Sequence, residues 1–210
     1  MPAYYPVYLN LNGKKCLVVG GGVVAERKVL TLLDCGANVK LISPALTPRL
    51  GELAGQRRFE YVSRTYQPGD SAGSFLVVGA TDNRKLHEQI TAEAESHNIL
   101  VNIVDVPDLC NFIVPSIVSR GDLQISISTG GKSPAMAKKI RRELERQFGD
   151  EYAQFLELMG QWRQEVLEKI PDGEKRREVF QNLVDSDILH LLKEGRREEA
   201  LRRAGELMGC

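Results

Sequence analysis

Three consecutive glycines, residues 20–22, constrain the fold of this sequence more than any other feature. They follow an apolar run and precede a segment with helical periodicity, and the spacing G-x-G-x-x-A is completed by Ala25. This pattern is typical of strand–turn–helix units that bind dinucleotides. Gly20 permits the tight turn, Gly22 leaves room for a pyrophosphate at the backbone, and Ala25 lets the helix pack closely on the strand. The N–H groups that begin such a helix are free to bind an anion.

Strand-like and helix-like segments alternate over the first half of the chain. Strands are predicted at 15–20, 38–43, 59–63, 74–79 and 99–104, and helices at 25–34, 47–54 and 83–96. This alternation predicts a parallel sheet with right-handed crossovers. We therefore expect an α/β fold with an open, doubly wound, Rossmann-like sheet.

The pattern changes in the second half, where a hairpin and a helix are predicted. Two β-rich segments, 112–119 and 123–129, are separated by three turn-forming residues, which is typical of a hairpin. Ser133 as N-cap and Pro134 as first helical residue then begin a helix that we expect to run to Phe148.

This helix is predicted to be amphipathic, with one apolar stripe of Met136, Ile140, Leu144 and Phe148 beside the basic run 138–142. A hairpin and one such helix cannot bury both of their faces alone. They need the first domain, the tail helices or a second copy of the chain, and a symmetric dimer is the commonest solution. A basic helix face is usually solvated, but facing a cofactor cleft it would suit a polycarboxylate substrate.

The last part of the chain is charged and helical, with breaks expected at residues 171–173 and 194–195. Phe155 and Trp162 are the expected anchors of a small helical core. The sequence thus predicts three parts: a dinucleotide-binding domain over 1–111, a dimerisation segment over 112–149 and a helical C-terminal domain over 150–210.

Composition excludes several classes of protein. The 28 basic and 28 acidic residues cancel, so no global field favours a nucleic-acid partner. No apolar run is long enough to span a bilayer, and residues 1–11 lack the pattern of a secretion signal. We therefore expect a cytoplasmic protein with neither a nucleic-acid nor a membrane partner.

The cysteines and histidines show no metal-ligand spacing, so we expect neither a metal site nor a disulfide framework. Cys16 and Cys35 are predicted to be core residues and Cys210 a loose C-terminal thiol. The three histidines are predicted to lie on the surface; they are His87, His97 and His190.

The ends of the first two strands are candidates for cofactor contacts, because ligands of open parallel sheets bind beyond the carboxyl ends of the strands. Ser43, Pro44 and Ala45 stand where a carboxylate usually holds the adenosine ribose. Ser43 has a hydroxyl that could donate to the ribose instead. No arginine stands immediately there for a 2′-phosphate, with Arg49 somewhat later, so NAD is favoured over NADP.

The ends of the fourth and fifth strands add further candidates. Ala80 and Thr81 are small enough to let a cofactor pass, and Asn102 is expected on the same edge, whereas Asp82 is expected mainly to cap the following helix. Asp105 ends the fifth strand, where a carboxylate is well placed for proton transfer. A turn aspartate before a proline explains Asp105 equally well.

The loop at 128–133 ends in G-K-S between a strand and a helix, but Ser126 stands where a nucleoside triphosphatase needs glycine. We therefore expect no triphosphatase. The side chains of Ser128, Thr129 and Lys132 would suit an anionic group beside Gly130 and a helix N-terminus. The alternative is a connector whose glycines serve turn geometry only.

Several blocks occur together in a characteristic order. They are Tyr5-Pro6-Val7-Tyr8, Val18-Val19-Gly20-Gly21-Gly22, Ala25-Glu26-Arg27-Lys28, Ala80-Thr81-Asp82, Asn102-Ile103-Val104-Asp105, Phe112-Ile113-Val114-Pro115-Ser116 and Ser128-Thr129-Gly130-Gly131-Lys132-Ser133-Pro134. As a set they resemble the precorrin-2 dehydrogenase and sirohydrochlorin ferrochelatase family, the dehydrogenase module of siroheme synthases. The resemblance extends to about Phe148.

The resemblance implies a homodimer that oxidises the tetrapyrrole precorrin-2 to sirohydrochlorin with NAD⁺. In bifunctional members it also implies iron insertion, with ferrous iron as a substrate. Asp105 matches the aspartate implicated in both reactions, and Val23, Val24, Pro44 and Ala45 match cofactor-contacting positions.

One further position of the resemblance concerns modification, and two alternative functions are weighed beside it. Thr129 stands where some members carry a serine that can be phosphorylated, and Ser128 is adjacent. An NAD-sensing regulatory dimer would share the glycine loop but would need neither the base Asp105 nor a second anion site. Another small-molecule NAD dehydrogenase is disfavoured, because the usual Tyr-x-x-x-Lys and catalytic-histidine patterns are missing.

Overall fold

The computed structural model of this chain describes residues 4–209. It separates into two compact units, Met1–Val114 and Pro115–Cys210, which are described one at a time. The prediction for the thiol of Cys210 lies outside the described residues.

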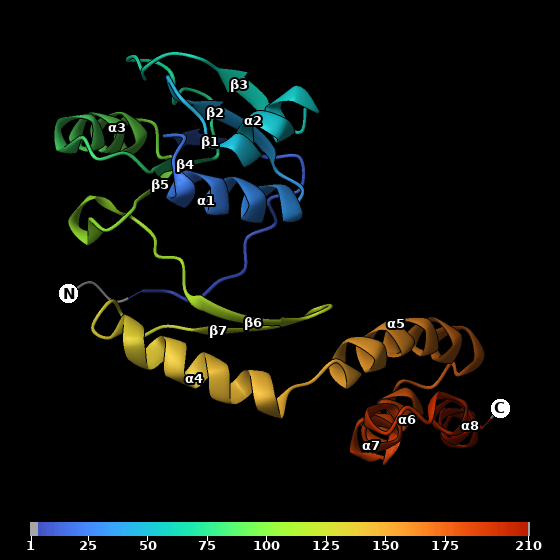
Figure 1. Cartoon of the computed structure of the whole chain (residues 1–210). Coiled ribbons are helices and arrows are strands. Elements are labelled where there is room, and N and C mark those ends of the chain that lie inside the picture. The colour runs from blue at the N-terminus through green and yellow to red at the C-terminus, as the bar shows by residue number, and fades with distance from the viewer. Residues whose placement is uncertain (1–3, 210) are drawn as a thin grey trace. The chain divides into compact units, whose positions relative to one another are not determined.

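The first unit is built on a five-stranded parallel sheet with the order β3-β2-β1-β4-β5 (Figure 1). Its strands are β1 (Lys15–Val19), β2 (Asn38–Ile42), β3 (Glu60–Val62), β4 (Leu76–Gly79) and β5 (Leu100–Ile103). Strand β1 lies at the centre and pairs with β2 on one side and β4 on the other. The order reverses between β1 and β4, so the predicted Rossmann-like α/β sheet is confirmed.

Helices cover both faces of this sheet and give it two cores. They are α1 (Val23–Asp34), α2 (Pro48–Gly55), α3 (Arg84–Ser96) and the short 3-10 helix η1 (Pro107–Leu109). Alternate residues of a strand point to opposite faces, so Val18 packs with α1 and α2, whereas Leu17 packs with α3. Both side chains are buried, as expected for a parallel sheet that is covered on both faces.

The second unit begins with the hairpin β6 (Ser116–Arg120) and β7 (Leu123–Ile127), followed by α4 (Pro134–Gln147). Ser133 caps α4 by accepting a hydrogen bond from the N–H of Met136, and Pro134 is its first residue, as predicted. The hairpin also forms as predicted, but residues 112–115 are not part of the strand. Pro115 explains the difference, because it has no N–H to continue the ladder beyond Ser116.

The buried seam of α4 differs from the predicted stripe. Ala137 is buried on α4, whereas Met136 is 48% exposed. Ile140 and Leu144 are partly buried in the same seam as Ala137, at helical spacings of three and four residues. Met136 stands one position further round the helix and therefore faces away from the hairpin.

Four helices form the rest of the second unit: α5 (Glu151–Lys169), α6 (Gly173–Asp185), α7 (Ile188–Lys193) and α8 (Arg197–Met208). The predicted breaks separate α5 from α6 and α7 from α8, while the break at 186–187 was not predicted. Phe155 and Trp162 are buried in the core of these helices, with ring centroids 6.3 Å apart in an edge-on arrangement. Their predicted role as anchors is confirmed.

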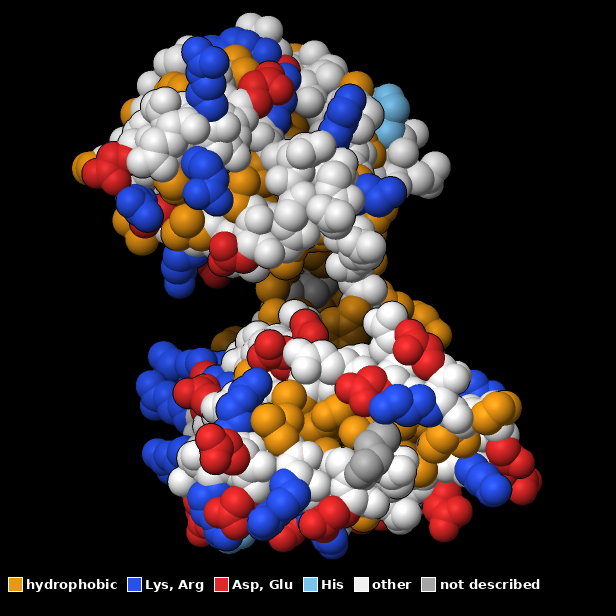
Figure 2. Space-filling view, turned by 90° about the vertical axis from the view of Figure 1, so that its right-hand side faces the viewer, with side chains coloured by type: hydrophobic (Ala, Val, Ile, Leu, Met, Phe, Trp, Pro, Cys, Tyr) orange, Lys and Arg blue, Asp and Glu red, His pale blue; other side chains and the backbone are white. Residues whose placement is uncertain are grey.

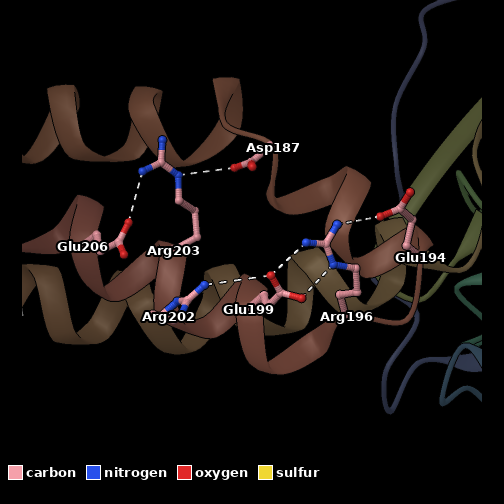
Figure 3. Close-up of polar contacts among 7 residues, drawn as sticks. All are labelled: Asp187, Glu194, Arg196, Glu199, Arg202, Arg203 and Glu206. Atoms are coloured by element: carbon pink, nitrogen blue, oxygen red, sulfur yellow. Dashed lines mark hydrogen bonds and ion pairs between the residues drawn. The ribbon is translucent and has the colours of Figure 1, made fainter.

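Ion pairs on the surface link the last two helices (Figure 3). The guanidinium of Arg203 on α8 lies 3.3 Å from the carboxylate of Asp187, and Arg196 lies between Glu194 and Glu199. The Arg196 guanidinium holds the pKa of the Glu199 carboxyl below its usual value. These side chains are exposed, so each pair contributes little to stability, and the apolar core determines how these helices pack.

Surface predictions are only partly confirmed. Cys16 is buried as predicted, but Cys35 is exposed because it is the C-cap of α1, where the chain turns away from the helix. His97 and His190 are exposed as predicted.

On the face that Figure 2 shows, basic and acidic side chains are interspersed. Within residues 4–209, no helix has the length and apolarity needed to cross a membrane.

The helical core can be tested with the single tryptophan as a reporter. Leu183 is fully buried in the same cluster as Trp162, whereas its neighbour Val184 is 49% exposed. Leu183→Ala is expected to lower the free energy of unfolding by about 2–5 kcal/mol, because it leaves a cavity. Urea unfolding followed by Trp162 fluorescence measures the loss. Val184→Ala is the matched control, with an expected change within about 0.5 kcal/mol, and equal effects of the two would contradict the packing described.

Candidate functional site

The first two glycines of the bend are held against neighbouring backbone. Gly20 has a φ of +119°, and a Cβ built on it would lie 2.1 Å from the carbonyl oxygen of Ala80. A Cβ on Gly21 would lie 1.9 Å from the carbonyl oxygen of Ala45. No side chain fits at either distance. The loops that follow β4 and β2 therefore approach the bend closely only because Gly20 and Gly21 have no side chains.

The third glycine is different, because a Cβ on Gly22 would meet open space. Its φ of −83° is one that any residue adopts. Gly22 is the N-cap of α1 and offers no side-chain bond to the helix, whereas Thr47 and Asn83 cap α2 and α3 with their side chains. The first N–H groups of α1 are thus left for water or an anion. This uncapped helix start at the switch point of the sheet fits a pyrophosphate.

The loop after β2 is tied to the bend by its own hydrogen bonds. The N–H of Thr47 donates to the carbonyl of Gly21 over 3.0 Å, and the Thr47 hydroxyl donates to the carboxylate of Glu26 on α1. The hydroxyl of Ser43 is buried and donates to the carbonyl of Ala45 over 2.7 Å. The sequence predicts that the Ser43 hydroxyl donates a hydrogen bond to a ribose, but in the structure this hydrogen bond goes to the protein itself. Pro44 and Ala45 are exposed.

The loop after β4 places Ala80 and Thr81, both partly exposed, beside Gly20. The prediction that Asp82 caps the next helix is wrong, because the side chain of Asn83 accepts the hydrogen bond from the N–H of Leu86. Asp82 itself is exposed and stands one residue too early to cap α3.

His87 contradicts the prediction that it is solvated, because only 4% of it is exposed. Its Nε2 lies 2.9 Å from the hydroxyl of Thr81, one of the predicted cofactor residues. The signal was present in the sequence, since residues 87, 90, 91 and 94 recur at the spacing of a buried helix face. His87 thus fixes the hydroxyl of Thr81 from behind the loop.

At the end of β5, Asp105 is exposed and takes the left-handed conformation, with a φ of +60°. Among the described residues, no hydrogen bond or ion pair holds its carboxylate, so the group is free to act on a ligand. Asn102 is buried, and its amide donates to the carbonyl of Phe112 over 3.2 Å. The amide nitrogen of Asn102 is therefore engaged within the protein.

Lys28 was quoted only as part of a motif, but the structure places its charge near Asp105. Burial of the ammonium lowers the pKa of Lys28, and the positive charge of Arg27 lowers it further. The electrostatic influence of Cys110 and of Asp105 acts in the opposite direction. A partly desolvated ammonium therefore lies within electrostatic range of the candidate base.

The second unit holds the predicted anion-binding loop between β7 and α4. Gly130 and Gly131 both have positive φ values, of 60° and 80°. The hydroxyl of Ser128 accepts a hydrogen bond from the N–H of Gly130, and that of Thr129 accepts one from Ser133. Lys132 is exposed. Both hydroxyls thus act as hydrogen-bond acceptors that shape the loop.

Across residues 4–209, no three or more His, Cys, Asp or Glu side chains converge on a point where an ion could be held.

Comparison with known proteins divides the chain into three consecutive matches. Residues 7–116 match a family described as putative NAD(P)-binding, residues 120–147 match the sirohaem biosynthesis protein central region, and residues 151–208 match the sirohaem synthase dimerisation region. The chain belongs to this sirohaem-biosynthesis family. The match described as putative NAD(P)-binding includes the glycine bend and supports a nicotinamide cofactor in the first unit.

Relatives of known name agree with the family. The chain is 35% identical to the siroheme synthase of Methylobacillus flagellatus over 96% of its own length, and 38% identical to that of Pseudomonas aeruginosa over 95%. It spans less than half of these relatives, 45% and 43% respectively.

Among solved structures, the precorrin-2 dehydrogenase SirC has the same fold. It superposes with a TM-score of 0.82 at 24% identity, over 97% of this chain and all of SirC. The likeness confirms the fold of this member of the sirohaem family.

The different roles of the glycines predict different costs of substitution. Gly21→Ala is expected to destabilise the protein by about 1–3 kcal/mol, because the loop after β2 must move away. Gly22→Ala is expected to change stability by less than about 0.5 kcal/mol, because the new methyl group enters open space. Thermal and urea unfolding of the two variants measure the difference. Equal destabilisation by both would show that the bend is packed differently.

Proposed function

We propose that this chain oxidises precorrin-2 to sirohydrochlorin with NAD⁺ as the hydride acceptor, and that it acts as a homodimer. One observation supports the proposal most: the uncapped start of α1, which follows Gly22, and the free carboxylate of Asp105 both lie at the carboxyl ends of strands in the same parallel sheet. A dinucleotide cradle and a candidate base therefore arise at the carboxyl ends of β1 and β5, two strands of one sheet that are separated by β4. Membership of the sirohaem family narrows the substrate class to tetrapyrroles.

The residues around the bend would hold the cofactor. We assign the pyrophosphate to the backbone of Gly20 and Gly22 and to the first N–H groups of α1, at Val23 and Val24. The adenosine half would lie along the loop after β2, and the nicotinamide half along the loops after β4 and β5. The loop residues on these two sides are Ser43, Pro44 and Ala45, and then Ala80, Thr81 and Asn102.

NAD rather than NADP is proposed because of the charges at the loop after β2. Arg49, the cation in the first turn of α2, lies 3.0 Å from the carboxylate of Glu52. Its charge is thus partly neutralised. A 2′-phosphate would find little positive potential there, whereas an unmodified ribose needs none.

Asp105 would serve as the base. Oxidation of precorrin-2 removes two electrons and two protons, which leave as one hydride and one proton, and NAD⁺ would supply the hydride acceptor when it is bound. The carboxylate of Asp105 takes up the proton, because it is exposed and no hydrogen bond or ion pair within residues 4–209 engages it. Insertion of ferrous iron by the same carboxylate stays a prediction.

The second unit would contribute the anion site for the substrate. Precorrin-2 carries several carboxylates, and the hydroxyls of Ser128 and Thr129 and the ammonium of Lys132 can each donate to one. Gly130 has no side chain to obstruct them. The family region described as dimerising supports the proposed dimer, which sedimentation would report as twice the 23.4 kDa chain mass. The cytoplasmic location stays a prediction.

An NAD-sensing dimer without catalysis is the alternative, and one assay distinguishes the two. Purified protein with precorrin-2 and NAD⁺ is expected to form NADH and to change the tetrapyrrole absorption spectrum. NAD binding without either change would support the sensor.

The cofactor pose is tested by Gly22→Val. The side chain would occupy the open space proposed for the pyrophosphate while leaving the backbone conformation accessible. We expect the Kd for NAD⁺ to rise at least about tenfold, measured by calorimetry, with little change in melting temperature. Wild-type affinity in the folded variant would place the cofactor elsewhere.

The proposed base is tested by Asp105→Asn. Asparagine adopts the left-handed conformation as readily as aspartate, so the turn is kept while the proton acceptor is lost. We expect kcat to fall by about 10²–10⁴, with the Kd for NAD⁺ unchanged. An unchanged kcat would remove Asp105 from the mechanism.

A further inference from the structure

The free edge of the sheet is covered by a short segment beside β5. Strand β5 is an edge strand, and the backbone groups on an open edge need partners. The side chain of Asn111 supplies them at the start of the strand: its oxygen accepts from the N–H of Val101 over 2.8 Å, and its amide donates to the carbonyl of Ile99 over 2.9 Å. Asn111 thus replaces part of a missing sixth strand.

Cys110 does the same at the end of the strand. Its sulfur accepts a hydrogen bond from the N–H of Ile103 over 3.1 Å, and it lies 3.7 Å from the side-chain amide of Asn102. Its thiol is within donating distance of two carbonyl oxygens, that of Ile103 at 3.2 Å and that of Val106 at 3.3 Å. The thiol therefore bridges Ile103, where β5 ends, and Val106, the residue after Asp105.

The turn that Cys110 spans is the one in which Asp105 is strained. Asp105 is one of few non-glycine residues with a positive φ, a conformation that persists only where the surroundings impose it. Burial raises the pKa of the Cys110 thiol, so the group stays protonated and can donate at neutral pH.

We propose that Cys110 is a positioning residue for Asp105: its thiol ties the two sides of the turn together and so aims the carboxylate. The inference rests on the proposed role of Asp105 as the base. Cys110 itself touches no reacting atom in this proposal.

A purely structural role for Cys110 is the competing explanation, and Thr91 offers a matched control. The Thr91 hydroxyl on α3 donates to the carbonyl of Leu109 over 3.1 Å. It anchors the same connector, next to Cys110 in the chain, without touching the turn. Thr91→Val removes that one hydrogen bond at nearly constant volume, so it reports what a loosened connector costs by itself.

The experiment measures kcat, the KM for precorrin-2 and the Kd for NAD⁺ in four single variants and one double variant. The single variants are Cys110→Ala, Cys110→Ser, Thr91→Val and Asp105→Asn, and the double variant combines Cys110→Ala with Asp105→Asn. We expect Cys110→Ala to lower kcat about tenfold, because a misplaced group loses its alignment with the substrate, while KM and Kd change less than about twofold. Cys110→Ser keeps a donor and an acceptor and is expected to restore most of kcat.

The double variant decides how Cys110 acts. Cys110→Ala is expected to cost nothing further once Asp105 is asparagine, because residues that act as a unit are not additive. A full additional loss in the double variant, or a loss in Thr91→Val as large as that in Cys110→Ala, would overturn the inference. If Cys110→Ala fails to fold, Cys110→Val, which removes the same bonds without a cavity, takes its place.

The two proposals fail in different ways. Wild-type kcat in a folded Cys110→Ala protein would overturn the positioning role and leave Asp105 as the base. Wild-type kcat in Asp105→Asn would overturn the proposed base, and the positioning role with it.

Discussion

The approach of two loops to the backbone of Gly20 and Gly21 is the constraint on which the rest of the first unit depends. Because neither residue has a Cβ, the carbonyls of Ala80 and Ala45 can close on the bend. That closure brings the ends of β2 and β4 against the central strand β1 and leaves the start of α1 uncovered. The cofactor cradle is thus a consequence of backbone packing, and the dipole of α1 adds an anion preference that the chain's zero net charge does not provide.

The three glycines form a single motif in the sequence, but they have two physical origins. Gly20 and Gly21 are explained by the fold itself, since a side chain at either would collide with protein. Gly22 has an ordinary conformation and an empty surrounding, so neither strain nor packing accounts for it. The open space at Gly22 is where we propose that the pyrophosphate lies, and this makes Gly22 the more informative residue about binding.

Much of the fold could be predicted from the sequence because apolar runs and helical periodicity are local signals. The exceptions are instructive. Cys35 is exposed because it stands at the C-terminal end of α1, where the helix stops. Met136 is exposed because it lies next to the buried Ala137 and therefore on another side of α4. In the candidate site, the strand ends were predictable, but the partners of Ser43 and Asn102 were not. The carbonyl of Phe112 that holds the Asn102 amide is ten residues away, and no local pattern encodes such a bond.

The position of Asp105 at the end of an edge strand links stability to the proposed chemistry. An edge strand needs its free N–H and C=O groups covered, whatever the protein does. Here Asn111 covers the start of β5, and the Cys110 thiol covers its end, where the turn of Asp105 begins. A central strand would have its backbone groups paired on both sides and no such side-chain bonds to spare. The edge therefore allows one residue to complete the sheet and to set the direction of a carboxylate.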